Sequence, residues 1–159
     1  MTHPPLLTWP RRTLLGALAA APFTRPAYAA GVVSFLIQAD KLLAPVSING
    51  VAVDAILDSG STISTLDAGF AGSLALRTRG RFSGRGVSGR VAGAWTTGVS
   101  FGIADQALRP ARVGVIDYSA LSRQLGRPVQ AVLGRDLFDA FVTDLDFAAR
   151  TLALHRREG

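Results

Sequence analysis

Short runs of apolar and β-branched residues dominate the chain after residue 30, and sustained helical repeats are rare there. The most specific pattern is a pair of β-prone runs on either side of Asn49-Gly50. It predicts a hairpin, because both residues of such a two-residue turn must adopt positive φ. Further strands are expected where similar runs are bounded by turn-forming residues, at 32–39, 51–57, 94–101, 111–116, 129–134, 141–147 and 151–155. The pattern predicts a single, mostly β domain.

Helical signals are few. Asp67 predicts the N-cap of a short helix that runs through Ala75, because its carboxylate can accept the free N–H groups of the first turn. A short helical segment is expected at 135–139, and about one helical turn within 118–128. Residues 77–93 are rich in Gly, Arg and Ser and show no apolar periodicity, which is typical of a mobile hairpin or loop.

Residues 1–29 have the pattern of an export signal. Arg11-Arg12 precede an apolar run at 14–21, and small residues at 27–29 form an A-x-A cleavage pattern. An amphipathic or core helix is the alternative interpretation, but proline flanks the run and small residues occupy the cleavage positions. The run is also shorter than the ~20 residues that are needed to span a bilayer. The paired arginines favour the twin-arginine route, with ordinary secretion as the alternative. We therefore expect residues 30–159 to form one periplasmic or otherwise exported domain without a membrane span.

Charge and composition exclude several classes of function. The chain has a formal net charge of +6, and Arg11, Arg12 and Arg25 of the export segment supply part of it. The excess that remains is too modest to indicate nucleic-acid binding. The chain has no cysteine, so it has no disulfide framework, and His155 is the only histidine after the export segment. No metal-ligand spacing is visible, and we expect no metal or other cofactor.

Candidate chemistry lies in Asp58-Ser59-Gly60-Ser61, which follows an apolar strand. Gly60 allows a sharp backbone turn, so the pattern places an acid on a tight turn at the end of a strand. Beside Ile56, Leu57 and Ile63, the Asp58 carboxylate is expected to be partly desolvated. Asp-Ser-Gly also caps ordinary turns, so the tetrapeptide alone leaves a purely structural role open.

A second motif, Gly134-Arg135-Asp136 after the apolar residues 131–133, changes the interpretation. With the Asn-Gly hairpin, Asp58-Ser59-Gly60-Ser61, the Gly-rich segment and the closing strands, it resembles the retropepsin-like aspartic peptidases, particularly the small exported bacterial ones. The resemblance runs over nearly all of residues 30–159. It implies a single-lobe acid-protease fold: a closed β-barrel with a flap hairpin and one or two short helices.

The resemblance also implies a mechanism and a set of site residues. Asp58 would be the catalytic residue, and because Asp-Ser-Gly occurs once, its twin would come from a second copy in a homodimer. The pair would activate a water molecule to hydrolyse internal bonds of a protein or peptide substrate. The remaining site residues are Ser59, Gly60 and Ser61, which support the active-site loop; Gly134, Arg135 and Asp136, which cross behind it; and Val87, Ser88, Gly89, Arg90 and Val91, which would close over the substrate as part of the flap.

Three departures from the family pattern bear on substrate preference. Ser59 lacks the methyl group of threonine, and Thr62 stands where viral relatives carry an acid, which removes one expected partner of Arg135. The flap segment is rich in arginine. A solvated flap is the simplest interpretation, while binding of acidic substrate residues or anionic lipid is the alternative.

Other interpretations stay open. A non-catalytic peptide-binding module could retain this fold, and a processing enzyme with one natural target would look inactive on generic substrates. Two further patterns fail on context. The G-x-S-x-G match at 98–102 lacks a strand-to-helix elbow, and the dinucleotide-type glycine pattern at 84–89 lacks a βαβ unit.

Overall fold

The computed structural model describes residues 31–86 and 89–157, so the predicted export segment lies outside the described residues. The strands are β1 (Val32–Ser34), β2 (Leu36–Gln38), β3 (Lys41–Ile48), β4 (Val51–Leu57), β5 (Thr65–Asp67), β6 (Arg79–Gly86), β7 (Gly89–Thr96), β8 (Phe101–Ile103), β9 (Gln106–Leu108), β10 (Val113–Ile116), β11 (Ala131–Leu133), β12 (Phe141–Asp146) and β13 (Thr151–Arg156). The helices are α1 (Ala68–Ser73), α2 (Ser119–Leu125) and α3 (Arg135–Ala140). The chain is mostly β, as the sequence predicts.

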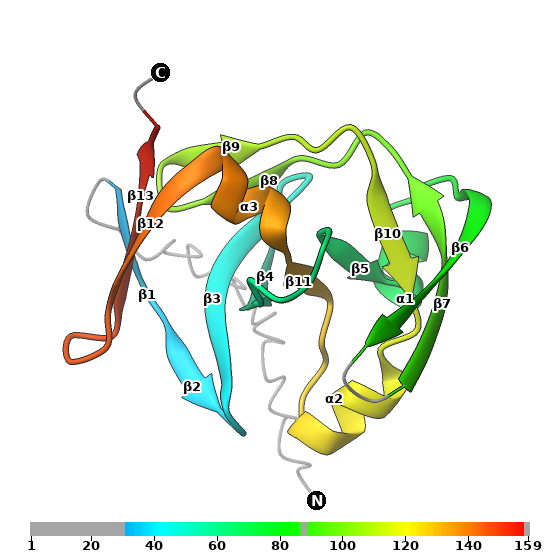
Figure 1. The fold of residues 1–159 in the computed structure, drawn as a ribbon, viewed down its shortest axis with the longest axis horizontal. Helices are drawn as coiled ribbons and strands as arrows, with labels where there is room; N and C mark the ends of the chain where they lie inside the picture. Colours follow the sequence, from blue (N-terminus) through cyan, green and yellow to red (C-terminus); the bar gives the residue numbers. More distant parts are fainter. Residues whose placement is uncertain (1–30, 87–88, 158–159) are drawn as a thin grey trace, which may run out of the picture.

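A ten-stranded sheet carries most of the fold. Its order is β6-β7-β10-β5-β11-β4-β3-β8-β9, with β2 paired to β3. Most neighbours are antiparallel, but β4 runs parallel to β11 and β5 runs parallel to β10. The parallel pairing of β4 with β11 brings the ends of these two strands together at the centre of the molecule (Figure 1).

Alternating side chains divide the central strands into two buried faces. One face contributes to the main core, which includes Ala55, Leu66 and Leu133. The opposite face forms a second cluster, in which Ile56 of β4 and Val132 of β11 pack with residues in and after α2. Because neighbouring residues of a strand point to opposite faces, both sides of β11 are buried along its length, and both sides of β4 are buried at Ala55 and Ile56.

A smaller three-stranded sheet has the order β1-β13-β12. Val33 of β1 lies opposite Leu152 of β13, so the beginning and the end of the described chain are paired. In Figure 1 this sheet and the β6–β7 hairpin lie at opposite sides of the molecule. Val33, Leu152 and Leu154 turn their side chains into the main core.

Several local predictions are confirmed. Asn49 and Gly50 have φ angles of 49° and 87°, as the predicted hairpin requires. The Asp67 side chain accepts a hydrogen bond from the backbone N–H of Phe70, which caps α1. The G-x-S-x-G match at 98–102 ends in strand β8, and no helix follows it.

Other expectations need correction. The single strand expected at 32–39 is two strands separated at Phe35, because β1 pairs with β13 whereas β2 pairs with β3. Of the two alternatives expected for residues 77–93, a hairpin or a loop, the structure forms the hairpin, since most of these residues belong to the paired strands β6 and β7. The closed barrel is also not formed: in residues 31–86 and 89–157 the end strands β6 and β9 pair only with β7 and β8, so the sheet stays open.

Candidate active site

Asp58 directly follows β4, where the buried part of the strand ends. Ile56 is buried, Leu57 is half-buried and Asp58 is exposed. The backbone N–H of Asp58 donates to the carbonyl oxygen of Leu133 at 2.9 Å, which continues the parallel β4–β11 pairing by one residue. The strand pair therefore fixes the backbone of Asp58 and leaves its carboxylate at the surface.

The turn after Asp58 closes on its own aspartate. The N–H of Gly60 donates to Asp58 Oδ1 at 3.0 Å, and the N–H of Ser61 donates to the Asp58 carbonyl oxygen at 3.0 Å. A Cβ atom at Gly60 would lie 3.2 Å from Asp58 Oδ1, closer than such contacts ordinarily are. Glycine thus permits the tight turn that orients the carboxylate.

Gly134 crosses directly behind this loop. The Arg135 N–H donates to the carbonyl oxygen of Ser61 at 2.8 Å. A Cβ atom at Gly134 would lie 2.4 Å from the carbonyl carbon and oxygen of Ile63, so no larger residue fits without moving the backbone. The structure thereby brings together the two motifs that the sequence analysis treated as one site.

Asp136 ties the crossing motif to the loop through Ser64. The Ser64 hydroxyl donates to Asp136 Oδ1 at 2.6 Å, and the Ser64 N–H donates to Oδ2 at 3.2 Å. The same hydroxyl oxygen accepts the N–H of Gly134 at 3.0 Å. Ser64 is fully buried, at 0% exposure. Ser64 could not be identified from the sequence, because a serine six residues after Asp58 carries no local signal.

Arg135 behaves differently from Asp136. Its Nε lies 3.3 Å from a carboxylate oxygen of Asp139 within α3, and both side chains are more than half exposed. Thr62 offers no carboxylate, which agrees with the expectation that Arg135 loses a partner in the loop. Arg135 therefore contributes its backbone N–H to the loop, while its side chain lies at the surface.

The expected desolvation of Asp58 is wrong for a single copy of the chain. The apolar neighbours Ile56 and Leu57 pack into the fold, and the Asp58 and Ser59 side chains both lie exposed. Within the described residues, the Ser59 hydroxyl makes no hydrogen bond. Ser61, in contrast, donates its hydroxyl to the Ile63 carbonyl oxygen at 2.9 Å and stabilises the loop from within.

Tyr118, at the start of α2, is a neighbour of this loop that the sequence analysis did not identify. Its phenol oxygen lies 2.5 Å from Thr65 Oγ1, and its N–H donates to Asp67 Oδ1. Burial raises the pKa of the Tyr118 phenol, the hydrogen bond to Thr65 opposes this, and the negative charges of Asp58 and Asp67 raise it further. The Asp58 carboxylate is thus close enough to act electrostatically on Tyr118.

The predicted flap corresponds to the β6–β7 hairpin. Gly89 and Arg90 are exposed and Val91 is half-buried, whereas Val87 and Ser88 lie outside the described residues. Nearer the body of the molecule, the rings of Phe82 and Trp95 contact each other, with centroids 4.5 Å apart. The guanidinium of Arg112, which directly precedes β10, lies 4.2 Å from the centroid of the Trp95 ring.

The described residues contain no cluster of three or more His, Asp or Glu side chains that could hold a metal ion. They also contain no helix that is long and apolar enough to cross a membrane.

Comparisons with known proteins relate this geometry to a family. A search of curated proteins finds no match. Among solved structures, the chain is similar to a retropepsin-like aspartic protease from Rickettsia conorii, with 17% identity over 77% of this chain and 87% of that one and a TM-score of 0.48. It is also similar to the EIAV protease in complex with the inhibitor HBY-793, with 25% identity over 61% of this chain and 84% of that one and a TM-score of 0.44. The family described as "Aspartyl protease" matches residues 44–137, a segment that contains both the Asp58 loop and the crossing motif. The chain belongs to the aspartyl protease family.

Proposed function

We propose that the protein is an aspartic endopeptidase in which Asp58 from each of two copies forms the catalytic pair. One observation carries the proposal. Asp58 is exposed on a turn whose backbone is fixed by a hydrogen bond to β11 and by close packing against Gly134, and this turn lies within the segment that matches the aspartyl protease family. Asp-Ser-Gly occurs once in the sequence, so one copy supplies one carboxylate. The exposed Asp58 and Ser59 fit a surface that a second copy covers.

The chemistry follows from the pairing of two like charges. Two carboxylates at close range cannot both ionise, so the pair shares one proton and titrates as a unit. The ionised member accepts a proton from the attacking water, and the protonated member donates to the carbonyl oxygen of the scissile peptide bond. The Ser59 hydroxyl, which has no partner among the described residues of its own chain, would bridge the two loops in such a dimer.

An extended peptide is the substrate form that suits this site. A peptide strand can add to an open sheet edge by backbone hydrogen bonds, with pockets for alternate side chains. The β6–β7 hairpin would close over it with Gly89, Arg90 and Val91, together with Val87 and Ser88. The Phe82 and Trp95 rings provide an apolar surface beside the path of the peptide.

Export of the protein is a separate part of the proposal. The twin-arginine pattern at 11–12 and the A-x-A pattern at 27–29 motivate it. Fractionation of cells that express the full chain should recover a shortened protein outside the cytoplasm, and replacement of Arg11 and Arg12 by lysine should keep it inside. Export that persists in the lysine variant would favour the ordinary secretory route.

The test of the activity compares the full chain with its Asp58→Asn variant. Both would be incubated with a diverse peptide library between about pH 3 and 7, where a carboxylate pair titrates, while sedimentation gives the mass in solution. We expect Asp58→Asn to lower cleavage by at least about 100-fold, since it removes acid–base catalysis. Asp40→Asn is the matched control, because Asp40 is exposed in the β2–β3 turn and asparagine tolerates its φ of 60°.

The outcomes separate the candidate functions. Cleavage that depends on Asp58 and follows the dimer concentration would establish the proposal. A folded dimer that cleaves nothing in the library would point to a single natural target or to a peptide-binding role. Cleavage that survives in Asp58→Asn would show that the reactive group lies elsewhere.

A further inference from the structure

Two arginines face each other at the end of the β6–β7 hairpin. Arg85 and Arg90 are direct partners in the antiparallel register, and both are exposed. Side chains in such a pair lie about 5 Å apart at Cβ, and like charges placed there destabilise the hairpin. No Asp or Glu occurs between residues 68 and 104, and neither arginine belongs to an ion pair within the described residues. The hairpin therefore carries an uncompensated positive pair.

The register shows which way this pair points. Side chains of directly opposite residues share a face, and the faces alternate along each strand. The pair Gly84–Val91 directly follows the pair Arg85–Arg90, so Val91 lies on the face opposite to the two arginines. Phe82 is two residues from Gly84 on the same strand and therefore shares this face with Val91. Arg81, paired with Ala94, lies on the arginine face.

Phe82 identifies the face that looks toward the Asp58 loop. A Cβ atom built at Gly114 would lie 3.0 Å from Phe82 Cζ and 3.1 Å from Ile63 Cδ1, so the Phe82 ring reaches the side chain of a loop residue. The arginine face is thus the outer face of the hairpin. This orientation does not favour the hypothesis that these arginines select substrate residues bound beneath the hairpin.

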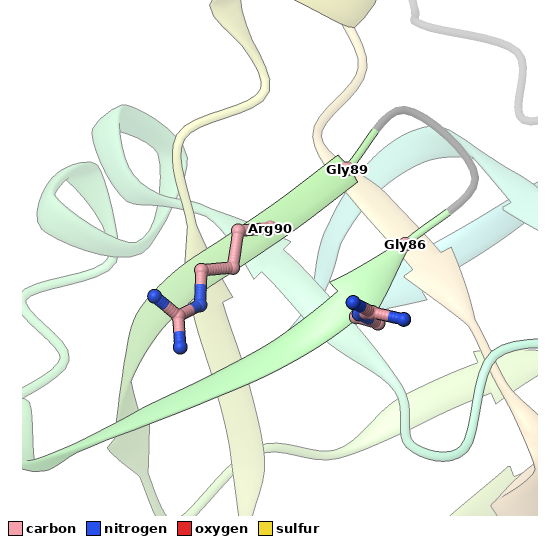
Figure 2. Close-up of a pocket in the computed structure, with 4 residues that line it drawn as sticks. Gly86, Gly89 and Arg90 are labelled. Atoms are coloured by element: carbon pink, nitrogen blue, oxygen red, sulfur yellow. The ribbon is translucent and has the colours of Figure 1, made fainter.

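The end of the hairpin is hollow. Arg85, Gly86, Gly89 and Arg90 line an open hollow of about 570 Å³. Figure 2 shows the Arg90 side chain extending from β7, with Gly89 next to it in the strand and Gly86 across from it on β6. Gly86 and Gly89 carry no side chains that would fill this space, and their backbone stays accessible, as both residues are exposed.

From this arrangement we propose that the outer face of the β6–β7 hairpin, defined by Arg81, Arg85 and Arg90, binds an acidic segment of the substrate polypeptide that lies outside the stretch held for cleavage. The inference rests on the proposed peptidase function for the identity of the partner. A planar guanidinium binds a carboxylate through two parallel hydrogen bonds, and two arginines that line one hollow suit Asp or Glu side chains. A polypeptide is also the macromolecule that a peptidase must engage.

The position of the surface sets a spacing. A chain that leaves the cleft must pass around two strands spaced about 4.8 Å apart before it reaches the outer face. An extended chain advances about 3.3 Å per residue, so roughly four to six residues separate the two contacts. Acidic residues immediately beside the scissile bond should therefore matter little, whereas an acidic tract that begins beyond these roughly four to six residues should increase cleavage.

The experiment uses three peptides that share one cleavable core: one with a distant Asp/Glu tract, one with the same tract as Asn/Gln, and one with two acids beside the cleaved bond. We expect the full chain to prefer the distant acidic tract by about fivefold in kcat/KM, a size suited to two exposed ion pairs. The preference should disappear in the double variant R85Q/R90Q and at about 0.5 M salt. The matched control R109Q/R156Q removes two exposed arginines elsewhere and should keep it.

A binding measurement separates this inference from the proposed function. The Asp58→Asn chain would be titrated with the fluorescent tract peptides, so that binding is read without cleavage. Tighter binding of the acidic tract that R85Q/R90Q abolishes supports the surface even if no peptide is ever cleaved. Equal binding of the acidic and neutral tracts would overturn it, as would a preference that survives R85Q/R90Q. Loss in R85Q/R90Q of binding to anionic lipid vesicles alone, with peptide binding unchanged, would also overturn it and identify a membrane surface as the partner.

Discussion

The hydrogen bonds between Asp136 and Ser64 should contribute most to the stability of the Asp58 loop, and Asp136→Ala tests this. The carboxylate accepts both donors of Ser64, the hydroxyl at 2.6 Å and the backbone N–H at 3.2 Å. It also accepts the N–H of Leu137 at 3.1 Å, but that group has a second acceptor in the Gly134 carbonyl oxygen at 3.0 Å. The change therefore leaves two polar groups of a fully buried residue without their acceptor.

The magnitude follows from these two groups. A buried donor without a partner costs about 1–3 kcal/mol, so we expect Asp136→Ala to lower the free energy of unfolding by about 2–4 kcal/mol. Asp136→Asn should cost about half as much, because it retains one acceptor oxygen and places an NH₂ group opposite the other donor. Since domains of this kind are stable by only about 5–15 kcal/mol, the alanine variant should be visibly weakened.

Urea denaturation of the full chain measures the effect, and Asp139→Asn is the control. Asp139 pairs with Arg135 on the surface of the same helix, with side-chain exposures of 63% and 69%, and such pairs contribute less than about 1 kcal/mol. The reasoning would be refuted if Asp136→Ala cost no more than Asp139→Asn. A fully stable Asp136→Ala chain would mean that Ser64 finds other partners.

Two further predictions concern Gly134 and Tyr118. Gly134→Ala should lower the free energy of unfolding in urea by about 3 kcal/mol or more, because its Cβ would lie 2.4 Å from Ile63 backbone atoms. The control Gly72→Ala in α1, where a Cβ meets nothing within 4 Å, should be neutral or stabilising, and equal effects of the two changes would show that Gly134 is not sterically required. The raised pKa of Tyr118 predicts that its phenol ionises above the ordinary tyrosine value of about 10 in an alkaline absorbance titration. Its contribution to stability should be complete below about pH 10 and lost as the pH rises through the folded-state value. A Tyr118→Phe variant that keeps the late ionisation would contradict this.

Local chemistry explains which parts of the fold the sequence could predict. The turn at Asn49 and Gly50 requires positive φ, and few residues other than these supply it. Gly134 was equally predictable as part of a motif, since the backbone of the Asp58 loop occupies the position of its missing Cβ. In both cases few residue types fit the backbone conformation or the close approach, so the residue type in the sequence indicates the local geometry.

Contacts between distant segments could not be predicted in this way. Ser64 and Tyr118 are common residue types, and their partners, Asp136 and Thr65, lie on other elements. The sequence predicted no more than a hairpin or a loop at 77–93, because Gly and Arg carry no alternating apolar signal, and the pairing of β7 with β10 could not be predicted. The exposure of Asp58 depends on whether a second copy covers it, which no local pattern encodes.

The pairing of β1 with β13 has a consequence for the order in which the protein folds. Val33 and Leu152 are direct neighbours in the small sheet although they lie at opposite ends of the described chain. During synthesis β1 emerges well before β13, and within the described residues it has no other partner strand. The loop that this pairing closes contains nearly all of the described residues, and contacts so distant in sequence form slowly. The apolar residues of β1 therefore remain unpaired until β13 has been made, and the pairing of β1 with β13 is a late step in folding.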